Sequence, residues 1–167
     1  MTKFMDKLPF IGLLSHLSQR YDRSFVYLLG MQYFNQGAKT LVWLAQTNLF
    51  KEHYHLEPSD MQYYFSFISI PWTIKIVYGL VSDNFPICGS HRRAYIILGA
   101  LMQLVFMTLM ALNCLEQFDQ GPAFATVCLT MGSMSVAMSD VIIDSLMVIQ
   151  SRQFPKDGAE ELQTYSW

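Results

Sequence analysis

Four ionisable side chains, Lys39, Lys75, Asp140 and Asp144, stand in stretches of the chain that otherwise carry almost no charge. A charged side chain inside a bilayer is costly and normally faces a partner or a water-filled cavity. Two carboxylates four residues apart share one helical face, where they can bind a metal, relay protons or hold a ligand rich in hydrogen-bond donors. Mutual neutralisation by the two lysines is the alternative, and it does not exclude a function.

A stripe of polar side chains surrounds the first of these lysines. Its members recur at intervals of three and four residues, as one face of a helix does, and are Gln32, Asn35, Gln36, Lys39, Trp43 and Gln46. Such a face predicts a helix that lines an aqueous cavity of substrate size. The alternative interpretation is polar contact between packed helices.

A second helical face follows at four-residue steps through Pro71, Lys75, Gly79 and Asp83. Proline removes a backbone hydrogen bond and predicts a kink, and glycine leaves room for a neighbouring helix. We expect Asp83 to face the Arg92–Arg93 pair across a short loop. That contact is either a surface ion pair of small energy or a latch that gates the protein.

The distribution of charge indicates the elements that position these residues. Only 14% of the 167 residues are charged, against about a quarter in a soluble domain. Residues 94–115 and 120–139 contain no Asp, Glu, Lys or Arg, and roughly 20 apolar residues suffice to cross a bilayer. With two further stretches interrupted only by Lys39 and Lys75, the sequence predicts an all-α membrane protein with four transmembrane helices, at residues 24–50, 61–82, 94–115 and 121–150.

The segments between these helices predict the orientation of the protein. They are an N-terminal segment with an interfacial helix (1–23), a loop (83–93) and a tail (151–167), and together they carry eight Lys or Arg against one on the opposite side. Because basic residues favour the inner side of a membrane, we expect both termini in the cytoplasm, or on the matrix or stromal side of an organelle. The identity of the membrane stays open.

Composition argues against several other classes of protein. A net charge of −2 without a basic cluster does not fit a nucleic-acid binder. Three cysteines lack the paired spacing of a zinc site. An enzyme that used Asp140 and Asp144 as metal ligands would need further carboxylates or a phosphate-binding motif nearby, and the sequence has neither. We therefore expect neither an enzyme nor a cofactor.

Several segments together resemble the folate–biopterin transporter family of the major facilitator superfamily. They are YFNQG (33–37), PWTIK (71–75), YGLVSDNFPICGSHRRAY (78–95), SDVIID (139–144) and GAEELQTYSW (158–167). The third is the most specific, because a glycine, an aspartate and paired basic residues follow one another in the family's longer form of this loop. Ser90, His91 and Ile76 depart from the residues common in the family.

The resemblance implies the first part of a twelve-span secondary transporter of folates or related pteridines that works by alternating access with proton coupling. It implies substrate contacts from Asn35, Gln36, Lys39, Lys75, Asp140 and Asp144, and gating by Gly79, Asp83, Arg92 and Arg93. A carboxylate can accept two hydrogen bonds from the pterin ring. Lys39 or Lys75 would then be the counter-charge for the carboxylates of folate.

Such transporters consist of two six-span halves, so the expected partners are the lipid bilayer, a pteridine substrate and the remaining transporter helices. The last segment resembles the entry to a fifth span, which indicates an N-terminal fragment. The alternative is a naturally short relative that serves as a structural subunit of a larger membrane assembly and transports nothing by itself.

Overall fold

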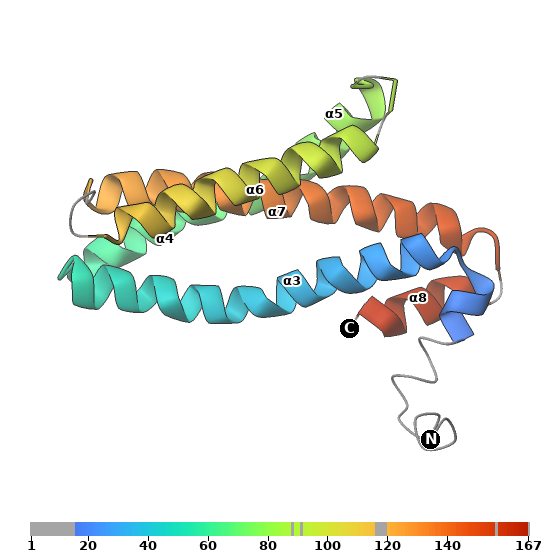
Figure 1. Ribbon diagram of the computed structural model, residues 1–167, viewed down its shortest axis with the longest axis horizontal. Helices are drawn as coiled ribbons and strands as arrows, with labels where there is room; N and C mark the ends of the chain where they lie inside the picture. The colour runs from blue at the N-terminus through green and yellow to red at the C-terminus, as the bar shows by residue number, and fades with distance from the viewer. Residues whose placement is uncertain (1–15, 88, 91, 116–119, 156, 167) are drawn as a thin grey trace, which may run out of the picture. The chain divides into compact units, whose positions relative to one another are not determined.

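The computed structural model describes residues 16–87, 89–90, 92–115, 120–155 and 157–166 (Figure 1). Most of these residues are helical, and none of the described residues forms a β-strand; an isolated bridge pairs Ile87 with Ser90. The helices are α3 (Arg23–Asn48), α4 (Pro58–Thr73), α5 (Lys75–Asn84), α6 (Arg93–Asn113), α7 (Pro122–Ser151) and α8 (Gly158–Ser166), with a π-helical turn, η1 (Leu49–His53), after α3. The predicted all-α fold is confirmed.

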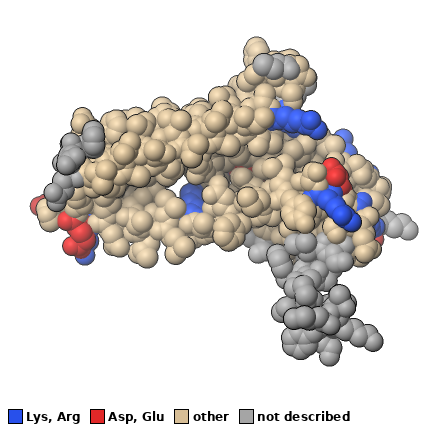
Figure 2. All heavy atoms as spheres, viewed as in Figure 1, with Lys and Arg blue, Asp and Glu red and all other residues tan. Residues whose placement is uncertain are grey.

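Three helical stretches of the described chain are long and apolar enough to cross a membrane: Pro58–Asn84, Arg93–Asn113 and Pro122–Ser151. They overlap the predicted spans at 61–82, 94–115 and 121–150. On the face shown in Figure 2, most of the described surface is neither acidic nor basic. The chain is therefore an integral membrane protein. Helix α3 has 26 residues and carries the polar stripe. It is not among these three stretches, so the membrane span at 24–50 stays a prediction.

The first of these stretches is interrupted at Ile74, between α4 and α5. Pro71 lies inside α4, so the interruption falls three residues after the proline at which we expected the kink. The Thr73 hydroxyl donates to the carbonyl of Ile70 at 2.7 Å, the same carbonyl that the N–H of Ile74 would use in a continuous helix. Pro71 removes one backbone hydrogen bond of α4, and Lys75 is the first residue of α5 after the break.

The chain divides into two units, which are described separately: Met1–Ala38 with Ile143–Trp167, and Lys39–Ile142. In the second unit, an apolar cluster forms around Phe50 of η1, which is fully buried. Its ring stacks on Tyr64 at 5.6 Å and meets Phe65 edge-on at 5.5 Å between centroids. Side chains from α4, α6 and α7 complete the cluster: Met61, Ile68, Met110, Ala125, Cys128 and Leu129.

Helices α6 and α7 approach each other closely in the same unit. A Cβ atom on Gly99 would lie 2.7 Å from the Ser139 hydroxyl and 3.4 Å from the carbonyl of Ser135. The Ser135 hydroxyl donates to Gln103 of α6 at 2.9 Å. The small side chains of Ser135 and Ser139 on α7 therefore allow a close approach to α6.

In the first unit, the segment that precedes α3 contacts the region around the start of α8. Leu17, Tyr21 and Leu162 are buried, and the rings of Tyr21 and Phe154 meet edge-on at 5.2 Å. Residues 16–20 are helical. Residues 1–15, which contain most of the expected interfacial helix, lie outside the described part of the chain.

Candidate functional site

A cluster of three charged groups and one indole ring lies among the apolar helices of the second unit. Lys75 donates to Asp140 in an ion pair, and the side chain of Asp140 is only 5% exposed. The ammonium groups of Lys39 and Lys75 lie 3.6 Å and 4.7 Å from the centroid of the Trp72 ring. We call Lys39, Trp72, Lys75 and Asp140 the Trp72 cluster.

Four helices supply the members of the Trp72 cluster, and Lys39 comes from α3. Trp72 is in the last turn of α4, Lys75 begins α5 directly after the break at Ile74, and Asp140 follows the small residues of α7. Interrupted helices mark the binding sites of many secondary transporters, because an irregular backbone is tolerated at membrane depth only in protein or beside a cavity. The one-residue break at Ile74 lies next to the charged groups of the Trp72 cluster.

Two cations and one carboxylate give the Trp72 cluster a formal charge of +1. The Lys75 ammonium group compensates the negative charge of Asp140, because a buried carboxylate without a partner would be costly. The indole nitrogen Nε1 of Trp72 is buried and has no hydrogen-bond partner among the described residues. The cluster can thus hold an anion at Lys39 and offers a carboxylate to a hydrogen-bond donor when Lys75 moves away.

The other predicted substrate residues belong to the first unit. The Tyr33 hydroxyl donates to Asp144 at 3.1 Å, while Asn35 is exposed and Gln36 half-buried on α3. The neutralisation of Asp140 by a lysine was weighed from the sequence, and the structure assigns Lys75 to it. Substrate contact at all six positions stays a prediction.

The predicted gating residues cluster near the loop between α5 and α6. Arg92 Nη2 lies 3.4 Å from Asp83 Oδ1, which confirms the expected contact across this loop, and Arg93 is exposed. A Cβ atom on Gly79 would meet Val141 of α7 at 3.2 Å. Within the loop, Gly89 has φ +75°, a conformation that favours glycine. A gating role is not tested by these contacts.

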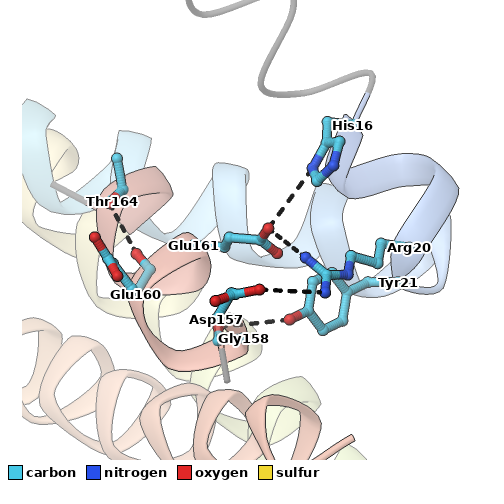
Figure 3. Close-up of polar contacts among 8 residues, drawn as sticks. All are labelled: His16, Arg20, Tyr21, Asp157, Gly158, Glu160, Glu161 and Thr164. Atoms are coloured by element: carbon cyan, nitrogen blue, oxygen red, sulfur yellow. Dashed lines mark hydrogen bonds and ion pairs between the residues drawn. The ribbon is translucent and has the colours of Figure 1, made fainter. Parts of the chain in front are cut away.

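A second group of charges joins the segment before α3 to the start of α8 (Figure 3). Arg20 donates to Glu161, lies 3.9 Å from Asp157 and stacks 4.4 Å from the centroid of the Phe154 ring. His16 Nδ1 is 3.9 Å from the same Glu161 oxygen. We call His16, Arg20, Tyr21, Phe154, Asp157 and Glu161 the N-terminal clamp.

Tyr21 closes the N-terminal clamp on its buried side. Its hydroxyl donates to the carbonyl of Gly158 at 3.4 Å. Burial raises the pKa of Tyr21 above 10.0, the Glu161 carboxylate raises this pKa further, and the Arg20 guanidinium opposes both. The neutral phenol is therefore the form that the folded protein prefers.

The sequence had not pointed to Trp72 or to the N-terminal clamp. Trp72 precedes Lys75 by three residues, which is the spacing of neighbours on one helical face. This spacing was the one sequence feature that could have indicated the contact between them. Arg20 and Glu161 are 141 residues apart, and no local pattern links them.

The helices and the Lys75–Asp140 pair among them define an all-α membrane protein. Comparison with known proteins identifies its family. The model of the BT1 family matches residues 36–167. The chain belongs to the BT1 family.

Curated relatives from three organisms support this assignment. The chain is 31% identical over 157 residues to "Probable folate-biopterin transporter 4" of Arabidopsis thaliana, covering 94% of this chain and 32% of the relative. It is 33% identical over 135 residues to "Folate-biopterin transporter" of Synechocystis sp., covering 81% and 26%. It is 37% identical over 94 residues to "Folate transporter 1" of Plasmodium falciparum, covering 56% and 18%.

The chain spans about a third or less of the length of these relatives. No solved structure matches it.

Proposed function

We propose that the chain supplies substrate-contacting helices to a secondary transporter of folate-like pteridines. The observation that carries the proposal is the Lys75–Asp140 ion pair beside an interrupted helix, within helices that are apolar enough to span a membrane. The names of the relatives support transport of folates or biopterin, and they support a transport role over an enzymatic one.

In this proposal Asp140 accepts the amino and ring N–H groups of the pterin, as a carboxylate can do with two parallel hydrogen bonds. Before the substrate binds, the ion pair with Lys75 stabilises the ionised form of Asp140. Protonation of Asp140 would release Lys75, which gives the pair a role in proton coupling. Asn35, Gln36 and Asp144 are further proposed substrate contacts on the evidence of the sequence.

The remaining parts of the proposal concern the whole transporter. It places the chain in the first half of a major facilitator fold, with both termini in the cytoplasm and alternating access as the mechanism. The Asp83–Arg92 contact, with Arg93 and Gly79, would hold one state closed on the cytoplasmic side. The expected partners are the bilayer, the substrate and the other transporter helices.

The test uses the protein at its natural full length, purified into proteoliposomes. We expect saturable uptake of labelled folate and biopterin that increases with a proton gradient, and loss of this uptake in Asp140→Asn. Asp60→Asn is the matched control, because Asp60 is exposed in the first turn of α4.

Absence of uptake by the unmodified protein would contradict the proposal. Stoichiometric copurification with other membrane proteins, together with that absence, would favour the structural-subunit alternative.

A further inference from the structure

Lys39 and Lys75 have different surroundings in the Trp72 cluster. Lys75 is committed to Asp140, and its side chain is 32% exposed. Lys39 is exposed on α3, and in the described part of the chain no carboxylate oxygen lies within 4.0 Å of its ammonium group. The sequence alone had left these two lysines as equal candidates for a substrate's counter-charge.

The indole ring compensates the Lys39 ammonium group only in part. A cation–π contact contributes less than a direct ion pair in a desolvated position, and a lysine at membrane depth normally has an anionic or aqueous partner. Trp72 nevertheless restricts where the ammonium group can be, because the ring packs with the buried cluster of Tyr78, Tyr95, Ala137, Met138 and Ile142. Lys39 is therefore a cation held at a defined place beside the Trp72 ring.

We infer that Lys39, positioned by Trp72, is the anion subsite that selects carboxylate-bearing pteridines over uncharged ones. The inference rests on the proposed function and deepens it by naming the substrate class. Folate carries a glutamate with two carboxylates, whereas biopterin carries a dihydroxypropyl chain without one. Lys75 is paired with Asp140 in this structure, and Lys39 is therefore the better placed of the two lysines to hold this anion.

The test compares initial uptake rates of folate and biopterin at varied concentration, in proteoliposomes of the full-length protein. Lys39→Gln should raise KM for folate about 10- to 100-fold, the loss expected for one hydrogen bond to a charged group, and leave KM for biopterin within about twofold. Lys39→Arg should retain most of the preference for folate. Lys51→Gln is the matched control, because Lys51 is an exposed lysine of η1.

Trp72→Leu tests the positioning role of the ring. It should raise KM for folate several-fold without a comparable effect on biopterin, because Lys39 keeps its charge and loses its fixed place. Unchanged size-exclusion profiles and circular dichroism of both purified variants check that they fold. Equal losses for both substrates, or no change in KM for folate, would overturn the inference.

A binding measurement separates failure of this inference from failure of the proposed function. The probe is p-aminobenzoylglutamate, which carries the two carboxylates of folate without the pterin. Thermal stabilisation of the detergent-solubilised protein by this compound, abolished in Lys39→Gln, would support the anion subsite even if the protein took up no pteridine. Absence of stabilisation in the unmodified protein would overturn the subsite.

Discussion

Removal of one member of the Lys75–Asp140 ion pair should destabilise the protein far more than removal of both. Asp140→Asn leaves the Lys75 ammonium group among apolar helices without its carboxylate. Replacement of both residues by apolar side chains of similar size, Lys75→Met with Asp140→Leu, removes the two charges together. Buried ion pairs commonly show this asymmetry, because the cost lies in the uncompensated charge.

The structure sets the magnitude. Breaking a buried pair costs about 3–5 kcal/mol, but the Lys75 side chain is 32% exposed and keeps its contact with Trp72, which retains about 0.5–2 kcal/mol. We therefore expect Asp140→Asn to lower the free energy of unfolding by roughly 2–3 kcal/mol, about a 30- to 150-fold change in the equilibrium constant. The double variant should lie within about 1 kcal/mol of the unmodified protein.

The assay is reversible unfolding in mixed micelles with increasing denaturing detergent, followed by circular dichroism. The two single variants and the double variant form a double-mutant cycle, which isolates the interaction energy of the pair. Asp60→Asn serves as the control for loss of an exposed carboxylate. A loss of less than about 1 kcal/mol in Asp140→Asn, or a double variant as unstable as the sum of the singles, would refute the reasoning.

Three further predictions concern the N-terminal clamp and the packing of α6 on α7. Arg20→Glu and Glu161→Arg should each lower the free energy of unfolding by roughly 1 kcal/mol, and their combination should recover at least half of the combined loss; additive losses in the double-mutant cycle would contradict a direct pair. Because the pKa of Tyr21 is raised in the folded protein, its contribution is present below pH 10.0 and is lost as pH rises through the folded value. Tyr21→Phe should therefore reduce the fall in stability between neutral pH and pH about 11, and an unchanged fall would exclude this cause. Gly99→Ala should cost about 1–3 kcal/mol in thermal or detergent unfolding, because its Cβ would lie 2.7 Å from the Ser139 hydroxyl. The matched Gly37→Ala, with nothing within 4 Å of its Cβ, should cost nothing, and equal effects would refute the close approach.

The helices could be predicted from the sequence because their signal is local. The uncharged run at 94–115 coincides with α6 (Arg93–Asn113) within two residues at each end. The uncharged run that begins at residue 120 predicts the start of α7, which begins at Pro122. The sequence predicted a kink at Pro71, and the helix is interrupted three residues later, at Ile74. Asp83 and Arg92 are nine residues apart, so their contact across one loop could also be expected.

The partners within the candidate site depended on tertiary contacts. Four charges allowed several pairings, and the choice of Lys75 for Asp140 depends on how α5 and α7 pack. Trp72 could not be distinguished from other aromatic residues of apolar helices, because its contacts with the two ammonium groups are tertiary. Arg20 contributed to the count of basic residues that predicted orientation, and its contact with Glu161 brings together residues 141 apart in the chain.

The most direct test of a water-exposed substrate site at Lys39 is thiol labelling of Lys39→Cys in the full-length protein after removal of the native cysteines. A membrane-impermeant thiol reagent should modify this cysteine, and a pteridine should protect it. Leu41→Cys is the control, because Leu41 is 71% exposed on the same helix and its apolar side chain is expected to face lipid, where the reagent cannot react. Modification of Lys39→Cys that folate prevents is the predicted result. A cysteine at position 39 that the reagent never reaches, or that reacts equally with and without folate, would contradict the account.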